Sequence, residues 1–357
     1  MKVLVLGATG YVGSRLVPYL LEHGHDVVAA SSSAPRPDHF GWDDRVRAVR
    51  CDVTDPAAVA KAVEGVDAIV YLVHSLDRSD FTDRDRVGAE TVAAAVAASD
   101  VRRLVYLSGL VPDVPETDLS AHLASRLEVE RILLSAVDGA AALRAGVVIG
   151  AGSTSFEIIR QVATLFLVQP VPAWLRSSVQ PVAVSDVLRA VDDALADDGP
   201  RGAVDLGGPD VIAYPDLMRV CGHEAGLSRL RLPAPFAPAG VVGLATALAT
   251  TAPFHTVTAL IASLRHDMVC RPDHTWRPSS GGPPLGVEEA IQRALTPRYA
   301  GPEGILASDP AWTRRHALLD VVPLPASGRA AARLALHRVR SLLPTPEPPE
   351  PPGTRAV

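Results

Sequence analysis

The chain has 357 residues, 48% of them apolar and 21% charged, which is typical of a soluble globular protein with one large or two moderate domains. The formal net charge of -6 offers no basic surface of the kind that nucleic acid requires, so nucleic acid is not an expected partner. The cysteines Cys51, Cys221 and Cys270 lie far apart and form no C-x-x-C pair, which argues against a metal site and favours a cytoplasmic location.

The N-terminal half alternates between segments with strand-like and helix-like patterns. Short apolar runs predict strands at residues 2–6, 26–30, 46–50, 68–73, 103–107 and 141–149. Apolar stripes with helical spacing predict helices at residues 10–23, 56–63, 87–98 and 122–136, with a polar segment at 77–86. Two later strands, at 182–184 and 203–206, flank a helix at 187–195. This alternation predicts an α/β fold with a doubly wound, Rossmann-type parallel sheet.

The remaining segments predict a second lobe and a tail. Residues 1–152 are expected to form the Rossmann-type domain, with 180–212 returning to it, and residues 153–300 a smaller, mostly helical lobe over the strand ends. The apolar run at 239–252 falls short of the roughly 20 residues that cross a bilayer, and it predicts a buried helix. Residues 301–357 form a C-terminal extension that ends in a disordered, proline-rich tail.

A basic amphipathic stretch at residues 329–343 precedes that tail. We interpret it as a solvated surface helix. The alternative is contact with an acidic membrane or a partner.

A glycine-rich loop lies between the first predicted strand and the first predicted helix. Gly7 permits a tight turn, Gly10 lets the backbone approach a pyrophosphate, and Gly13 lets the helix pack closely on the sheet. The helix N-terminus offers free N–H groups and a positive dipole end to the phosphates. The motif therefore predicts a dinucleotide site formed by Gly7, Thr9, Gly10, Tyr11, Val12 and Gly13.

The end of the second strand predicts which dinucleotide is bound. A carboxylate there would bind the ribose 2′-hydroxyl of NAD, but this chain has Ser31 and Ser32, with Arg36 just beyond. Hydroxyl groups and an arginine suit a 2′-phosphate, which favours NADP(H) over NAD(H). Asp52 and Val53, after the third strand, are expected near the adenine. For Asp52 the equal alternative is a helix-cap or turn residue.

These motifs resemble the short-chain dehydrogenase/reductase superfamily, in its extended and atypical branches, over roughly residues 1–300. The glycine loop, Asp52-Val53 and Tyr106-Leu-Ser108-Gly109 match its common motifs. A closer similarity, to the NAD(P)H-binding, NmrA-like and NAD-dependent epimerase/dehydratase-like proteins, comes from Tyr71-Leu-Val-His74-Ser75, His122-Leu-x-Ser125-Arg126 and Leu264-Arg-His266-Asp267. The resemblance implies an NAD(P)-dependent oxidoreductase acting on a small organic molecule between the lobes.

The resemblance also points to the catalytic positions. Typical members carry a Tyr-x-x-x-Lys pair after the fifth strand, where the lysine lowers the tyrosine pKa. This chain has His122 and Arg126 at those positions, and Ser108 where the usual serine lies. Histidine can act as a general acid, and Arg126 would lower its pKa. The alternatives are a structural His–Arg pair and an ordinary strand-end hydroxyl.

His74 follows the fourth strand and is expected to line the nicotinamide side of the site, because ligands in open α/β sheets lie along that edge. The missing Tyr-x-x-x-Lys pair leaves a second hypothesis open. In that hypothesis the chain binds NAD(P)H without turning it over, as a redox sensor or scaffold.

Overall fold

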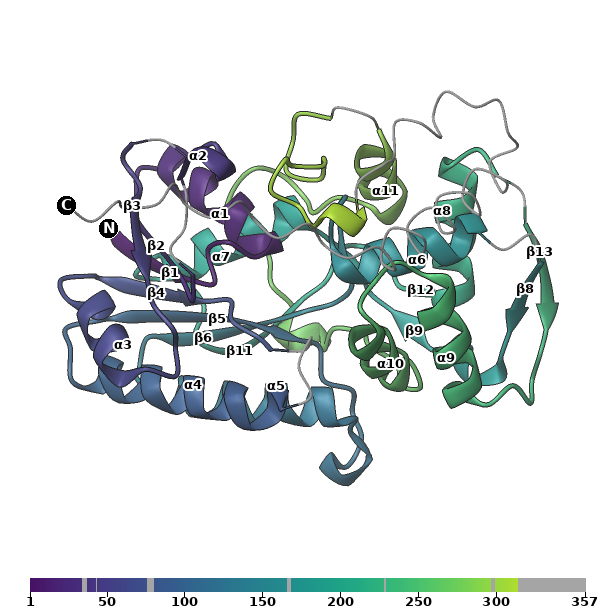
Figure 1. Ribbon diagram of the computed structural model, residues 1–357, viewed down its shortest axis with the longest axis horizontal. Coiled ribbons are helices and arrows are strands. Elements are labelled where there is room, and N and C mark those ends of the chain that lie inside the picture. Colours follow the sequence, from purple (N-terminus) through teal and green to yellow (C-terminus); the bar gives the residue numbers. More distant parts are fainter. Residues whose placement is uncertain are drawn as a thin grey trace, which may run out of the picture.

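The computed structural model of the chain describes residues 1–33, 37–42, 44–75, 80–165, 168–227, 229–296 and 299–313 (Figure 1). Seven of the eight predicted strands pair into one sheet, whereas the strand predicted at 182–184 lies outside this sheet because it pairs with residues 148–149. The strand order is β11-β6-β5-β4-β1-β2-β3, and every pairing is parallel. The strands are β1 (Lys2–Leu6), β2 (Asp26–Ser31), β3 (Arg47–Arg50), β4 (Ala68–Tyr71), β5 (Arg103–Gly109), β6 (Ala140–Ala145) and β11 (Gly202–Leu206).

The strand order reverses next to β1. The chain passes from β1 to β2 and β3 on one side, and then returns to place β4 on the other side. A crevice opens at the carboxyl ends of the strands where such an order reverses, and ligands of open α/β sheets bind there. The fold therefore places the expected ligand site at the ends of β1 and β4.

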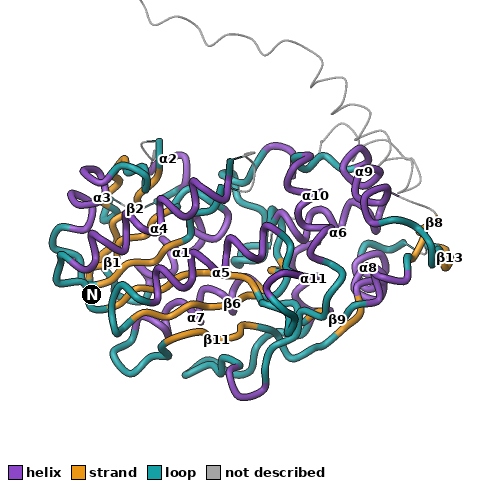
Figure 2. The backbone as a smooth tube through the Cα atoms, turned by 90° about the horizontal axis from the view of Figure 1, so that it is seen from below, coloured by secondary structure: helices purple, strands orange, loops and turns teal. Residues whose placement is uncertain are grey.

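Helices cover both faces of this sheet (Figures 1 and 2). One face packs against α1 (Tyr11–Glu22) and α7 (Val184–Leu195), with Leu16 and Val191 fully buried. The other packs against α3 (Pro56–Val63), α4 (Phe81–Ala97) and α5 (Ala121–Leu134). The short helix α2 (Pro37–Phe40) follows β2. The prediction of a doubly wound, Rossmann-type sheet is confirmed.

The second lobe lies beyond the carboxyl ends of the strands (Figure 1). Its helices are α6 (Thr154–Leu165), α8 (Tyr214–Glu224), α9 (Ala239–Ala249), α10 (Phe254–Ser263) and α11 (Val287–Leu295). Its strands form two-stranded pairs: β7 (Val148–Ile149) with β10 (Val182–Ala183), β9 (Ser178–Val179) with β12 (Ile212–Ala213), and β8 (Val168–Val171) with β13 (Leu230–Pro233). Single 3₁₀ turns are η1 (Glu116–Asp118), η2 (Ala173–Arg176), η3 (Pro272–His274) and η4 (Ala311–Thr313).

Two of the predicted elements differ most in their bounds from the structure. The strand predicted at 141–149 is broken, because Gly146 packs so closely on another segment that a Cβ there would lie 2.0 Å from the Gln180 carbonyl oxygen. Beyond this point the chain leaves the sheet as β7. The polar segment predicted up to residue 86 is helical from Phe81, where Arg86 pairs with Asp83 and Glu90 one turn away on either side.

The apolar segment at 239–252 forms α9, but the prediction that this helix is buried is wrong for one of its faces. Ala239 and Ala247 are buried, whereas Val241 is 62% and Leu244 48% exposed. The buried face therefore carries small residues, whereas Val241 and Leu244 point outward. Within the described ranges, no helix combines the length and apolar character needed to span a membrane.

Residues 299–313 return to α1 and pack against it. Arg15 is 3% exposed and donates to both carboxylate oxygens of Asp309, at 2.7 and 2.8 Å. It also donates to the carbonyl oxygens of Ala151 and Gly304, at 2.9 Å each. This part of the expected C-terminal extension is therefore tied to the first turns of α1. The basic stretch at 329–343 and the proline-rich tail lie outside the described residues.

Candidate functional site

The glycine loop connects β1 to α1 with each glycine in a distinct setting. Gly7 has φ +85°, a conformation that glycine adopts without strain. A Cβ at Gly13 would lie 2.4 Å from the Gly7 carbonyl oxygen, so the helix start requires glycine there. Gly10 has an ordinary φ of -75°, and a Cβ there would meet only the Gly7 oxygen, at 3.3 Å. The space next to the Gly10 Cα, where a side chain would lie, is therefore open, and a pyrophosphate could approach the backbone there.

The N-terminus of α1 is suited to an anion. Gly10 is the N-cap and provides no side chain to cap the helix, and the first turn contains no acidic residue. The first N–H groups of a helix have no partner within it, and the helix dipole adds positive potential at this end. The residues present therefore fit a pyrophosphate between Gly7 and Gly13.

The end of β2 lies beside this loop. The hydroxyl groups of Thr9 and Ser31 are 2.8 Å apart, so Ser31 is joined to the loop, whereas Ser32 is exposed. The guanidinium of Arg50 donates from Nε to the Ser32 carbonyl oxygen, at 3.2 Å. Arg50 was not predicted from the sequence. The register of β2 and β3 would have revealed it, because these strands pair Ser31 with Arg50. Arg36 lies outside the described residues.

Asp52 and Val53 both have structural partners. The Asp52 carboxylate accepts hydrogen bonds from the Thr54 hydroxyl and from Arg84, each at 2.8 Å, as the turn-residue alternative expected. Val53 is 7% exposed, and a Cβ on Gly88 of α4 would lie 2.8 Å from its Cγ2. Their contact with adenine stays a prediction.

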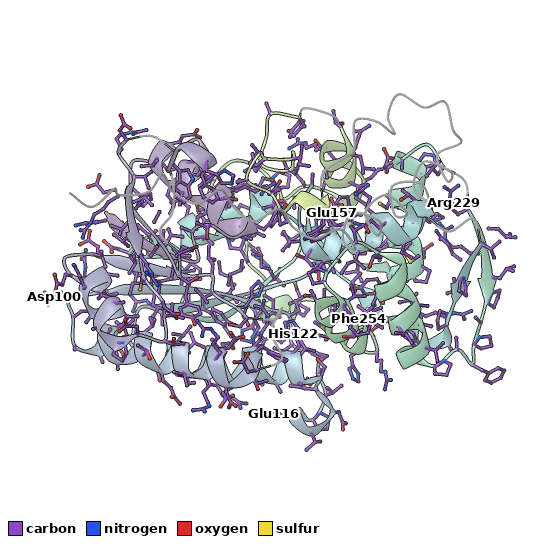
Figure 3. The ribbon with its side chains drawn as sticks, in the orientation of Figure 1. Asp100, Glu116, His122, Glu157, Arg229 and Phe254 are labelled. Atoms are coloured by element: carbon purple, nitrogen blue, oxygen red, sulfur yellow. The ribbon has the colours of Figure 1, made fainter. Side chains whose placement is uncertain are left out.

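One cavity of about 430 Å³ brings the loop and the catalytic candidates together. At one end it is lined by the glycine loop, through Gly7, Gly10, Tyr11, Val12 and Gly13. Beyond the loop it is lined by His74, Ser108, His122 and Arg126. Figure 3 shows His122 between the sheet and the helices of the second lobe. Four segments that are distant in the sequence therefore meet at the crevice where the strand order reverses.

Ser108 and Arg126 lie at the end of β5. Ser108 is 3% exposed, and its hydroxyl group lies next to the buried phenol of Tyr106. Arg126 donates from Nη1 to the Leu107 carbonyl oxygen, at 3.1 Å, and its Cδ packs over Gly109. Ser108 and Arg126 both line the same cavity.

His122 is the second residue of α5, whose N-cap Ser120 accepts a hydrogen bond from the Leu123 amide at 3.3 Å. Burial lowers the pKa of His122 to about 3, with further lowering by the charges of Arg126 and His74. The sequence analysis predicted a lowered pKa from the charge of Arg126, but burial of the imidazole is the larger cause. The imidazole is therefore neutral near pH 7 and offers one N–H donor and one nitrogen acceptor.

A carboxyl group that the sequence did not single out lies behind Arg126. Burial raises the pKa of Asp85 on α4, although a hydrogen bond from Ser75 and the positive charges of Arg126 and Arg84 oppose this. One Asp85 oxygen is buried without a hydrogen bond among the described residues. Asp85 does not line the cavity, so it influences the site through its electrostatic interaction with Arg126, which does line it.

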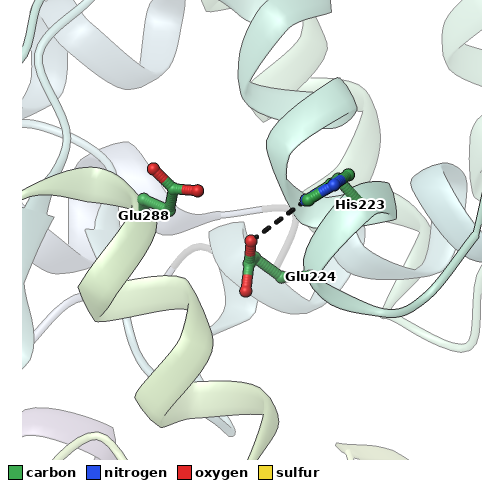
Figure 4. Close-up of side chains that lie close together, drawn as sticks. All are labelled: His223, Glu224 and Glu288. Atoms are coloured by element: carbon green, nitrogen blue, oxygen red, sulfur yellow. Dashed lines mark hydrogen bonds and ion pairs between the residues drawn. The ribbon is translucent and has the colours of Figure 1, made fainter.

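A separate group of side chains on α8 and α11 has spacing that could suit a metal ion. Ligand atoms of His223, Glu224 and Glu288 lie within 4.8 Å of one another, and His223 bonds Glu224 at 3.2 Å (Figure 4). His223 and Glu288 are exposed, and none of the three lines the cavity. Exposed acidic groups of this kind are common without an ion, and we assign no site to them.

Comparisons with known proteins identify the N-terminal part of the chain. Residues 7–145 match the family described as NAD(P)H-binding. The chain is 25% identical over 338 residues to an uncharacterized protein of Mycobacterium tuberculosis, covering 85% of this chain and 35% of that protein. It is 35% identical over 113 residues to 2-alkyl-3-oxoalkanoate reductase of Stenotrophomonas maltophilia, covering 30% of this chain and 33% of the reductase.

The chain thus spans about a third of the length of these curated relatives. Among solved structures, it superposes on the NAD complex of Thermus thermophilus UDP-glucose 4-epimerase with a TM-score of 0.59 and 19% identity, covering 82% of this chain and 97% of the epimerase. Residues 7–145 are therefore similar to the NAD(P)H-binding family, and the chain shares its fold with the UDP-glucose 4-epimerase.

Proposed function

We propose that the chain is an NADP(H)-dependent oxidoreductase, acting in the cytoplasm on a small organic carbonyl compound or the corresponding alcohol. The observation that carries this proposal is the shared cavity, lined by the glycine loop at one end and by Ser108, His122 and Arg126 beyond it. The partial similarity to a reductase named for an oxo acid supports a carbonyl substrate.

Each cavity side chain has a role in this proposal. The bound nucleotide supplies or accepts the hydride. In the direction of reduction, the hydride would add to the carbonyl carbon and the carbonyl oxygen would take a proton from solvent water, which would give the alcohol and the oxidised nucleotide. Ser108 donates a hydrogen bond to the substrate oxygen, Arg126 stabilises the negative charge that develops there, and neutral His122 polarises the carbonyl through its N–H. His74 lines the nicotinamide side.

The test is single-turnover oxidation of bound NADPH in the presence of a panel of aliphatic and aromatic carbonyl compounds. We expect at least one compound to accelerate the oxidation, and Arg126→Leu to slow it by about 100-fold, the effect of losing one charge-stabilising donor. Exposed Arg219→Leu on α8 is the matched control and should leave the rate unchanged. If no compound oxidises bound NADPH, the catalytic proposal is wrong.

The preference for NADP(H) is proposed to depend on Ser32 and Arg50. Arg50→Ala is expected to weaken NADPH binding by about tenfold and leave NADH binding unchanged, since it removes a charge next to the 2′-phosphate. Ser32→Asp should move the preference towards NADH. The control is Arg47→Ala, an exposed arginine at the other end of β3. Equal effects of Arg50→Ala on both nucleotides would place the 2′-site elsewhere.

The lowered pKa of His122 predicts a specific dependence of stability on pH. Above about pH 6.5, the ordinary histidine value, this imidazole is neutral in both the folded and the unfolded chain. As the pH falls from about 6.5 towards about 3, the unfolded chain binds a proton that the folded chain does not, so stability falls. His122→Gln removes this loss.

Urea unfolding of both proteins at pH 7.5, 6.0 and 5.0 measures this effect, with exposed His274→Gln as the control. The stability of wild type relative to His122→Gln should decrease with falling pH. If the free energies of unfolding of wild type and His122→Gln fall by the same amount, His122 has an ordinary pKa in the folded chain. The same shift predicts no step near pH 6.5 from His122 in the rate of hydride transfer.

The second candidate function is non-catalytic NAD(P)H binding, as a redox sensor or scaffold. It is favoured by the same neutral His122, because a neutral imidazole is a much weaker proton donor than an imidazolium, and by the absence of the Tyr-x-x-x-Lys pair from the sequence. It predicts tight NADPH binding with no oxidation by any carbonyl compound in the panel. Membrane contact through residues 329–343 remains a separate prediction.

A further inference from the structure

The cavity continues past His122 and Arg126 to a wall of apolar side chains. Helix α10 presents Val257, Leu260 and Ile261 to it, a spacing of three and four residues that keeps them on one face of the helix, and the C-cap residue Leu264 continues this face. Figure 1 shows α10 beside the end of α5. This wall was not predicted from the sequence.

Other elements extend the apolar lining around this end of the cavity. Helix α6 contributes Ile158 and Ile159, and the chain adds Met268 and, from the segment that returns to α1, Trp312. Ile158 and Ile159 are each less than 10% exposed, at 9% and 8%. The lining therefore comes from four separate parts of the second lobe and its continuation.

The same lining is poor in charge. Among the described residues that line the cavity, Arg126 is the single residue with a permanent charge. None of these lining residues is an aspartate or a glutamate. Asp85 lies behind Arg126 and offsets part of its positive charge. Two of its hydroxyl groups are already bonded within the protein: Ser153 donates to the Val148 carbonyl oxygen at 2.8 Å, and Ser263 is bonded to Ser120 at 2.9 Å.

A fixed link holds the apolar wall against the catalytic candidates. The Ser120–Ser263 hydrogen bond joins the end of α10 to the N-cap of α5, two residues before His122. A molecule lying along α10 therefore has one end next to His122 and Arg126.

From this arrangement, and resting on the proposed function, we infer that the substrate is a lipophilic carbonyl compound. Its single polar or anionic head lies at Arg126 and Ser108, and its alkyl part lies along α10 and α6. A nucleoside diphosphate sugar fits this end poorly, because its diphosphate and hydroxyl groups would lose hydrogen bonds to water against the apolar wall. Alkyl groups gain from the same burial.

The experiment measures binding to the NADP⁺-loaded protein with two series of probes, straight-chain alkanoates and 2-alkanones, from four to ten carbons. In both series we expect the affinity to rise about three- to fourfold for each added methylene, which is the effect of burying one such group. Arg126→Leu should weaken the alkanoates at every length while leaving the slope of both series unchanged. UDP-glucose should bind more weakly than decanoate.

Variants of Leu260 test the wall itself. Leu260→Glu should abolish the dependence on chain length, and the milder Leu260→Ala should reduce it if the glutamate variant does not fold. Val241→Glu places the same charge on α9 at a side chain that is 62% exposed and does not line the cavity, so it should keep the wild-type slope.

An affinity independent of chain length in wild type, or unchanged by both Leu260 variants, would overturn the lipophilic assignment. Tighter binding of UDP-glucose than of decanoate would also overturn it. NADP⁺ binding is measured first, so failure of the proposed nucleotide site is seen separately from failure of this inference.

Discussion

Replacing Asp309 by alanine is expected to lower the free energy of unfolding by about 3 to 5 kcal/mol, the cost of leaving a buried charge without its partner. The Arg15 and Asp309 side chains are 2% and 1% exposed, and they are joined by two hydrogen bonds of 2.7 and 2.8 Å. Alanine removes the carboxylate and leaves the guanidinium in a site that water does not reach. The backbone carbonyls around Arg15 keep some of its hydrogen bonds but none of its charge compensation.

Denaturant unfolding monitored by tryptophan fluorescence measures this loss. The control is Glu289→Ala, which breaks the exposed pair with Arg293 and should cost no more than about 1 kcal/mol. The double variant Arg15→Met, Asp309→Leu should recover part of the loss, because it removes both charges together. A change below about 1 kcal/mol in Asp309→Ala would mean that residues 299–313 do not pack on α1 as described.

Gly10→Val is expected to weaken NADP(H) binding by about 100-fold or more while leaving the stability of the fold almost unchanged, a loss of about 2.7 kcal/mol in binding alone. Gly10 has an extended conformation, with φ -75° and ψ 174°, that valine adopts without strain. A Cβ there has a single close neighbour, the Gly7 oxygen at 3.3 Å. The branched side chain would instead occupy the space above the N-terminus of α1 that a pyrophosphate needs.

Gly13→Ala provides the matched control within the same loop. Its Cβ would lie 2.4 Å from the Gly7 oxygen and 2.7 Å from the Ala8 Cα, so this variant should lose stability as well as binding. Equilibrium dialysis with NADPH and thermal unfolding of both variants separate the two effects. If Gly10→Val binds NADPH as wild type does, the phosphates do not lie at this loop.

The sequence was sufficient for features that neighbouring residues determine. Strands such as Lys2–Leu6 are continuous apolar runs, and the glycine loop needs only the strand before it and the helix after it. The bounds of Pro56–Val63 were predicted correctly because Asp55 caps that helix and proline begins it. In each case the residues that determine the element lie within the element or a few positions from it.

Features that depend on distant contacts were not predictable in this way. Arg15 looks like an ordinary helical arginine until Asp309, 294 positions later, is placed against it. Arg50 becomes a candidate for nucleotide binding only through the register of two strands, and the apolar face of α10 has meaning only once the helix lies beside α5. His122 was chosen as a candidate from the sequence, but its burial, which dominates its pKa, depends on elements that the sequence does not place.

Calorimetric titration of the whole chain with NADPH, NADP⁺, NADH and NAD⁺ tests the central claim most directly. We predict one nucleotide bound per chain, with the two phosphorylated nucleotides bound more tightly than their counterparts. The absence of heat with all four nucleotides, together with no competition between them, would contradict the assignment of the cavity to a pyridine dinucleotide.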